Sequence, residues 1–189
     1  MLEAFAVSTG VVALGEIGDK TQLLALLLAA RFRKPWPIVA GILVATLLNH
    51  AGASALGAWL AQVIDPQWMR WGLGLSFIAV AVWLLIPDSA EDVGGTERAG
   101  WGVFAVTTVA FFLAEMGDKT QIATVMLAAK YQALAVVTAG TTLGMLIANV
   151  PAVLFGDRVV TKLPVQWVHR IAALVFAALG VAVLLGAGG

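Results

Sequence analysis

The sequence predicts an all-α polytopic membrane protein with six transmembrane helices, arranged as two inverted-topology repeats of three helices each. Hydrophobic residues make up 61% of the 189 positions and charged residues only 12%, which is typical of a chain embedded in lipid rather than of a soluble domain. A polar heptad also occurs twice, 99 residues apart, within long apolar segments. These observations together indicate a duplicated membrane protein.

Six segments are long and apolar enough to cross a bilayer, which takes about 20 residues of helix. The predicted spans are residues 4–30, 37–63, 69–87, 101–129, 133–156 and 166–187. Charged residues, prolines or both separate consecutive spans, and such residues favour exposed loops over lipid. The separators, in chain order, are residues 31–35, Asp65-Pro66, the stretch from Pro87 to Gly100, Lys130-Tyr131, and the stretch from Asp157 to Pro164.

The chain aligns with itself at an offset of 99 residues without a gap. The match pairs Phe5 with Phe104 near the start and Gln67-Trp68 with Gln166-Trp167 near the end. Each half holds three spans, so the second half must enter the membrane from the opposite side, as in many transporters. The predicted organisation is a first three-helix repeat (1–87), an acidic cytoplasmic linker (88–100) and a second, inverted repeat (101–189).

The basic residues of the loops predict the orientation, because cytoplasmic loops are enriched in Lys and Arg. If both termini lie outside, only Arg70 and Lys130 fall in outer loops. We therefore expect a multi-pass protein of the cell's inner (cytoplasmic) membrane with both termini outside. The cytoplasmic loops would then carry Arg31, Arg33, Lys34, Arg98, Arg158, Lys162 and Arg170.

The two heptads, residues 16–22 and 115–121, lie near the centres of their spans. Ionisable groups at this depth are costly, so they indicate a functional site. On a continuous helix Glu16 and Asp19 would share a face, because they are three residues apart. Gly18 and Gly117 permit either the close approach of a neighbouring helix or a local break in the helix.

In an inverted pair the two motifs can converge, and the joint site would carry a charge of −2 if every group were ionised. Such an all-oxygen site suits one dehydrated divalent cation of the Ca²⁺, Mn²⁺ or Mg²⁺ type. Without the metal, clustered carboxylates repel one another and take up protons, so metal and protons compete for the same oxygens. The alternative is a purely structural pairing of Glu16 with Lys20 and of Glu115 with Lys119. The predicted metal ligands are Glu16, Asp19, Glu115 and Asp118.

Polar side chains at the centres of neighbouring spans are candidates for the same cavity. His50 would shift selectivity from Ca²⁺ towards Mn²⁺ and could carry a proton, although a single intramembrane histidine also serves as a helix–helix hydrogen-bonding group. Asn149 stands at the position that His50 has in the first repeat. The predicted supporting or proton-path residues are Lys20, Thr21, Gln22, Lys119, Thr120, Gln121, Asn49, His50 and Asn149.

The duplicated Glu-x-Gly-Asp-Lys-Thr resembles the signature of small cation/proton exchangers found in bacterial membranes and in the eukaryotic Golgi and chloroplast. These form the second calcium/cation antiporter group of the lysine-exporter superfamily, and the resemblance covers essentially the whole chain. It implies two inverted three-helix repeats, exchange of Mn²⁺ or Ca²⁺ for H⁺, and a cation site made by the four acids of the two motifs.

The leading hypothesis is a secondary active transporter, not an enzyme, that exports a divalent cation in exchange for protons by alternating access around the midplane site. Mn²⁺ is the first expectation and Ca²⁺ the second, and no cofactor is expected. The expected partners are the cation, protons and the lipid bilayer, without nucleic acid because the net charge is zero. A monomer and a homodimer are both compatible with the sequence. The alternatives are an intramembrane aspartyl protease using Asp19 and Asp118, an amino-acid exporter, or a structural membrane subunit.

Overall fold

The computed structural model describes residues 1–86, 102–156 and 165–186, and the regular structure of these residues is entirely helical. The predicted linker, residues 88–100, lies outside this range, as do Arg98, Arg158 and Lys162. The described helices are α1 (Leu2–Glu16), α2 (Lys20–Phe32), α3 (Pro35–Val63), α4 (Pro66–Trp83), α5 (Val103–Glu115), α6 (Lys119–Tyr131), α7 (Leu134–Phe155) and α9 (Val165–Leu184).

The predicted class, an all-α polytopic membrane protein, is confirmed. Three long helices are each apolar enough to cross a membrane on their own, namely α3, α7 and residues 166–184 of α9. The first and fourth predicted spans are each two shorter helices in series, α1 with α2 and α5 with α6. A continuous helix through each heptad is therefore wrong, and the local break that the glycines permit is what occurs.

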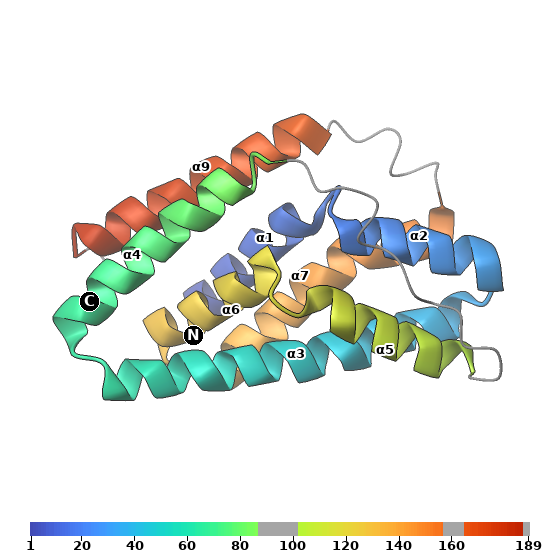
Figure 1. Cartoon of the computed structure of the whole chain (residues 1–189), viewed down its shortest axis with the longest axis horizontal. Helices are drawn as coiled ribbons and strands as arrows, with labels where there is room; N and C mark the ends of the chain where they lie inside the picture. The colour runs from blue at the N-terminus through green and yellow to red at the C-terminus, as the bar shows by residue number, and fades with distance from the viewer. Residues whose placement is uncertain (87–101, 157–164, 187–189) are drawn as a thin grey trace.

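Equivalent helices of the two halves run in opposite directions, as α3 and α7 do, and α4 and α9 (Figure 1). The turns that follow α2 and α6 also match, because Arg33 and Gln132, 99 residues apart, both adopt left-handed backbone with φ of 51° and 47°. The packing repeats as well: α3 lies against α5 as α7 lies against α1.

Glycines at equivalent positions allow these two helix pairs to come close. A Cβ atom on Gly41 of α3 would lie 2.7 Å from the Cβ of Thr107 on α5. A Cβ atom on Gly140 of α7 would lie 2.8 Å from the carbonyl oxygen of Phe5 on α1. Both contacts need a residue without a side chain, which is the usual way for membrane helices to pack closely.

Helices α4 and α9 form a pair that lies to one side of the other helices (Figure 1). Phe77 and Phe176, again 99 residues apart, meet in this pair with ring centroids separated by 6.1 Å. The pair packs asymmetrically on the rest of the molecule: α4 contacts α6 and α9 contacts α1. In the repeat, α2 corresponds to α6 and α5 corresponds to α1. The contacts equivalent by this correspondence, α9 with α2 and α4 with α5, are at most marginal among the described residues.

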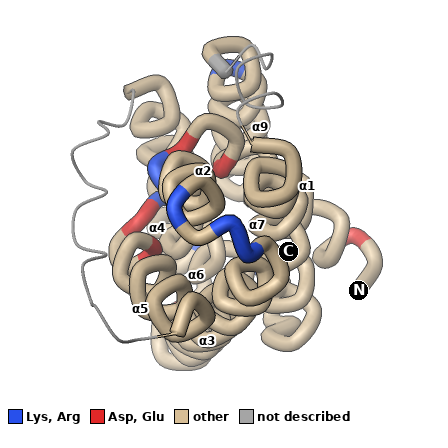
Figure 2. The backbone as a smooth tube through the Cα atoms, turned by 90° about the vertical axis from the view of Figure 1, so that its right-hand side faces the viewer, with Lys and Arg blue, Asp and Glu red and all other residues tan. Residues whose placement is uncertain are grey.

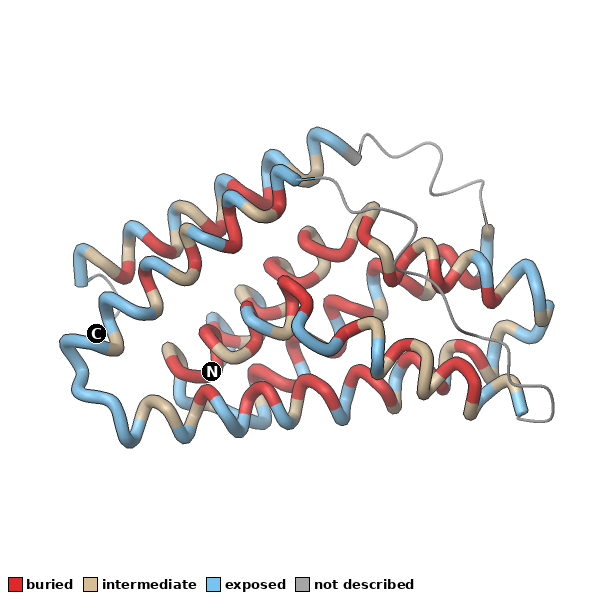
Figure 3. Tube along the Cα trace, viewed as in Figure 1, coloured by how far each residue is buried: buried red, intermediate tan, exposed pale blue. Residues whose placement is uncertain are grey.

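Two clusters of buried apolar side chains reflect this arrangement. One joins α4 and α9 to α1, α6 and α7 and is centred on Phe77, Phe176 and Leu127. The other joins α2, α3 and α5 to α1 and α7 and includes Ile42 and Phe111. Buried segments accordingly concentrate on the helices that cross the middle of the bundle (Figure 3).

Candidate metal site

Each polar motif lies at a break between two helices. Helix α1 ends at Glu16 and α2 begins at Lys20, while α5 ends at Glu115 and α6 begins at Lys119. The chain turns at Gly18 with φ of 83° and at Gly117 with φ of 75°, a left-handed conformation that costs glycine little. In each motif the glutamate therefore ends one helix, and the aspartate stands at the N-cap position of the next without a side-chain capping hydrogen bond.

The glutamine of each motif satisfies a backbone group that the break exposes. The N–H of Gly18 donates to Oε1 of Gln22 at 2.9 Å, and the N–H of Gly117 donates to Oε1 of Gln121 at 2.7 Å. In hydrocarbon an unpaired backbone group costs several kcal/mol, so these side chains stabilise the broken helices. Gln22 and Gln121 thus hold the backbone at the site.

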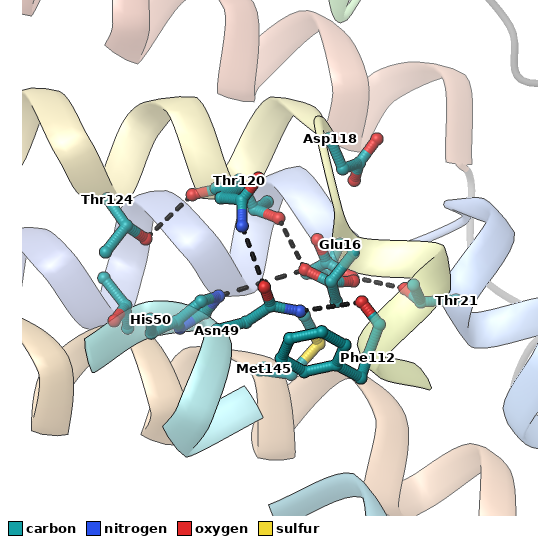
Figure 4. A network of polar contacts seen from close by, with 12 residues as sticks. Glu16, Thr21, Asn49, His50, Phe112, Asp118, Thr120, Thr124 and Met145 are labelled. Atoms are coloured by element: carbon teal, nitrogen blue, oxygen red, sulfur yellow. Dashed lines mark hydrogen bonds and ion pairs between the residues drawn. The ribbon is translucent and has the colours of Figure 1, made fainter. Parts of the chain in front are cut away.

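The same two glutamines tie the breaks to the opposite repeat. Nε2 of Gln22 donates to the carbonyl oxygen of Ala148 on α7 at 2.8 Å, and Nε2 of Gln121 donates to Oδ1 of Asn49 on α3 at 2.8 Å. Nδ2 of Asn49 in turn donates to the carbonyl oxygen of Phe112 at 2.9 Å (Figure 4). Both polar atoms of Asn49 are thereby engaged, so it braces the second break.

The structure gathers three of the four predicted acids into one group. Glu16, Asp19 and Asp118 each offer a carboxylate oxygen within 4.8 Å of those of the other two, and all three are buried. Glu115 is also fully buried but does not belong to this group. The predicted convergence of the two motifs is therefore seen, with Glu115 buried nearby but outside this three-acid group.

The lysines form ion pairs that cross between the motifs. Nζ of Lys119 lies 2.7 Å from Oδ1 of Asp19, and Nζ of Lys20 lies 3.2 Å from Oδ1 of Asp118. Acidic and basic segments lie next to each other in the view along the bundle (Figure 2). Each lysine therefore neutralises an aspartate of the other repeat, which the interpretation as separate Glu–Lys pairs within each motif did not foresee.

The crossed pairs leave the charge of the two glutamates to be balanced. The hydroxyl of Thr21 donates to Oε2 of Glu16, and that of Thr120 donates to Oε2 of Glu115 at 3.2 Å. The second oxygen of each glutamate, Oε1, is buried without a hydrogen-bond partner, as is Oδ2 of Asp118. Buried oxygens rarely lack a partner, so these atoms are the candidates to receive an ion.

The two remaining candidates, His50 and Asn149, are buried and differ in their contacts. Nδ2 of Asn149 donates to the carbonyl oxygen of Met145 at 3.1 Å, whereas its Oδ1 has no hydrogen-bond partner. Both ring nitrogens of His50 lack a hydrogen-bond partner, and Nε2 lies 3.9 Å from Oε2 of Glu115 (Figure 4).

One contact at the site involves a residue that the sequence reasoning missed. Nε2 of His169, on α9, donates to the carbonyl oxygen of Ile17 in the first break at 2.8 Å. An ionisable residue within the predicted span 166–187 was the available signal. The equivalent of His169 in the first repeat is Arg70, which is exposed on α4. This contact links the α4–α9 pair directly to the first motif.

Comparison with known proteins gives one family and several relatives. The family model described as divalent cation/proton antiporter GDT1 matches residues 4–92 and 103–189. A Vibrio cholerae protein named "Putative manganese exporter" is 49% identical over 177 residues, covering 93% of this chain and 88% of that protein. A GDT1-like protein of Synechocystis is 29% identical, covering 93% and 94%. The rice GDT1-like protein 4 is also 29% identical, covering 93% and 71%. No solved structure matches the chain significantly.

Proposed function

The chain belongs to the GDT1 family of divalent cation/proton antiporters, and on that premise we propose that it exports Mn²⁺ from the cytoplasm in exchange for entering protons. The family is one of transporters, not of enzymes. The oxygen ligands of the site suit a hard divalent cation such as Mn²⁺ or Ca²⁺, and the name of the Vibrio relative supports Mn²⁺ as the first candidate.

The observation that carries the proposal is the charge balance of the buried site. Two lysines pair with two aspartates across the repeats, and Glu16 and Glu115 keep two carboxylates without a cation of their own among the described residues. One divalent cation balances two carboxylates, and protons that bind the same oxygens balance them equally. Competition for these oxygens makes one site serve both ions, which is what exchange requires.

The alternative functions fit less well. An intramembrane aspartyl protease is excluded by membership of a transporter family, and each of its two aspartates is held by a lysine. An amino-acid exporter would need groups for an ammonium and a carboxylate, whereas the unpartnered atoms of this site include three carboxylate oxygens. A cation is the better occupant.

We infer that the α4–α9 pair rocks against the rest of the bundle during transport. In this structure α4 packs on α6 and α9 packs on α1, whereas the pair makes at most marginal contact with the equivalent helices α5 and α2 among the described residues. The two repeats share one fold, so a second state related to this one by exchange of the repeats would have α4 packed on α5 and α9 packed on α2. Exchange between these two states would expose the site to each side of the membrane in turn.

Transport in proteoliposomes under an imposed pH gradient tests the proposal. We expect Mn²⁺ to move against the proton gradient, Ca²⁺ to move less efficiently, and Mg²⁺ to be the poorest substrate. Glu16→Gln and Glu115→Gln should abolish transport because each removes one of the two carboxylate charges while keeping the size of the side chain.

Asp65→Asn is the matched control, because Asp65 is an exposed acid that caps α4 far along the chain from either motif. Its transport should equal that of the unmodified protein. Full transport in both glutamine variants would contradict the proposed site. Metal movement that is indifferent to the pH gradient would contradict proton exchange.

A further inference from the structure

The two motifs carry the same polar residues, yet the groups facing them from the neighbouring helices differ. Helix α3 places Asn49 and His50 at the site, whereas the equivalent positions of α7 hold Ala148 and Asn149. Of these two helices, α3 therefore supplies an imidazole and α7 does not. A metal ion between the repeats would meet carboxylate oxygens from both motifs and an imidazole nitrogen from α3.

His50 is buried in a way that an ordinary packing residue is not. Its side chain is fully inaccessible, and neither ring nitrogen has a hydrogen-bond partner. Leaving a polar group buried without a partner costs about 1–3 kcal/mol. Thr46, one helical turn earlier on the same face of α3, also has a buried hydroxyl oxygen without a partner. The face of α3 that carries His50 and Thr46 can therefore bind a polar ligand or an ion.

The distance from His50 to Glu115 fits a shared cation better than a hydrogen bond. Nε2 of His50 lies 3.9 Å from Oε2 of Glu115, beyond hydrogen-bonding range. Two ligands of one divalent cation, each bound at about 2.0–2.6 Å, lie roughly 3–5 Å apart. The second oxygen of Glu115 is also without a partner.

We propose that His50 binds the transported metal directly through Nε2, together with Glu115, and that it is the residue that favours Mn²⁺ over Ca²⁺ and Mg²⁺. The inference rests on the proposed function and assigns its specificity to one residue. Imidazole nitrogen is a good ligand for transition metals and a poor one for Ca²⁺ and Mg²⁺, which prefer oxygen. Glu16, Asp19 and Asp118 would then supply charge and affinity for any divalent cation, and His50 would supply discrimination.

The direct test is pulsed electron paramagnetic resonance of Mn²⁺ bound to the purified protein, carrying no polyhistidine tag and labelled with ¹⁵N in histidine only. The chain has two histidines, His50 and His169. We expect a ¹⁵N coupling typical of a coordinated imidazole, which persists in His169→Gln and disappears in His50→Asn. Coupling in the unmodified protein shows that a histidine binds the metal, and its persistence in His169→Gln assigns it to His50, so the conclusion does not rest on whether His50→Asn folds.

Selectivity provides the second readout. His50→Asn installs the residue that the second repeat has at the equivalent position, so a smaller side chain that offers an amide oxygen replaces the imidazole. We expect this variant to lose its preference for Mn²⁺ over Ca²⁺ by about tenfold or more, measured as the ratio of the two transport rates in one preparation.

The outcomes separate the two proposals. Mn²⁺ that binds and is transported without any histidine coupling, with an unchanged Mn²⁺/Ca²⁺ ratio in His50→Asn, would overturn the role of His50 and leave the proposed function standing. A protein that neither binds nor moves Mn²⁺ would overturn the proposed function, and the role of His50 with it.

Discussion

At the scale of single residues, the crossed ion pairs give the side chains of the two motifs different roles: the lysines and aspartates neutralise one another, and the glutamates remain to bind a cation or protons. Lys20 pairs with Asp118 and Lys119 pairs with Asp19, so the two aspartates and two lysines balance one another across the repeats. Glu16 and Glu115 remain as the charges that a cation or protons must balance. The lysines are therefore part of the site, and their pairing also joins the two halves.

A double-mutant cycle tests whether this pairing is energetically real. Lys20→Met should destabilise the protein by roughly 3 kcal/mol because it leaves Asp118 buried and unpaired, and Asp118→Asn should cost less because Lys20 is 19% exposed. The double variant should be more stable than the sum of the two losses predicts, by about 1–3 kcal/mol. Unfolding in detergent micelles measures this coupling.

The cycle that pairs Lys20→Met with Asp19→Asn is the control. These residues are neighbours in one motif, whereas the structure pairs Lys20 with the aspartate of the other. A clearly smaller coupling is expected there. Equal coupling in the two cycles would contradict a pairing that depends on the contact between repeats.

At the scale of the helix, the functional element is the break. A continuous helix would place Glu16 and Asp19 one turn apart with their backbone groups fully hydrogen-bonded. The break instead makes the glutamate the end of one helix and the aspartate the start of the next, and a glutamine completes the hydrogen bonding of the exposed glycine N–H. The positive φ of Gly18 and Gly117 is the feature that permits this arrangement.

Gly117→Ala tests the break without introducing a clash, since an added Cβ atom would have no neighbour within 4 Å. The alanine must still adopt φ of 75°, and we expect a loss of about 1–2 kcal/mol in stability together with impaired transport. Thermal unfolding and proteoliposome transport measure the two effects.

Gly10→Ala supplies the comparison. Gly10 lies inside α1, and an added Cβ atom there also has no neighbour within 4 Å. Alanine favours a helix interior by roughly 0.5–1 kcal/mol, so this variant should be as stable as the unmodified protein or more so. Similar losses in the two variants would show that the break does not depend on the left-handed glycine.

At the scale of the whole molecule, the asymmetry between two similar repeats defines the state that the structure captures. Helices α4 and α9 meet at Phe77 and Phe176 and cover α6 and α1. His169 links this pair to the first break through the carbonyl oxygen of Ile17. In the state related by exchange of the repeats, Arg70 would take the place of His169 and Met116 that of Ile17.

Cross-linking distinguishes the two states. The chain has no native cysteine, so only the introduced thiols can react. We expect Ile17→Cys with His169→Cys to react with a short, reducible thiol cross-linker in the state described here. Arg70→Cys with Met116→Cys should react only when the opposite state is populated. Either cross-link should stop transport, and reduction should restore it.

The idea of a moving pair fails on either of two results. One is a 17–169 cross-link that leaves transport intact. The other is a 70–116 pair that never reacts while the protein is transporting. Reaction of each double variant in denaturant, where both thiols are accessible, controls for the competence of the cysteines.

Much of this architecture could be predicted from the sequence, because it depends on patterns along the chain. Apolar length predicts the spans, the repeat with its odd number of spans predicts inversion, and the depth of the heptads predicts a buried polar site. The breaks were predicted only as one of two alternatives for Gly18 and Gly117. The sequence cannot separate them, because glycine allows both the close approach of a neighbouring helix and a backbone with positive φ.

What the sequence by itself determined is a duplicated, all-helical membrane protein with two motifs that share the same polar residues, near the middle of the first span of each repeat. Only the tertiary structure decided that Lys20 meets Asp118 rather than a partner in its own motif, that Glu115 stands beside His50, and that the α4–α9 pair lies against α1 and α6. The physical reason is that both motifs carry the same residues, so pairing within a motif and pairing between motifs have the same sequence signature. The choice between them depends on the dihedral angles at the breaks and on how the two repeats dock.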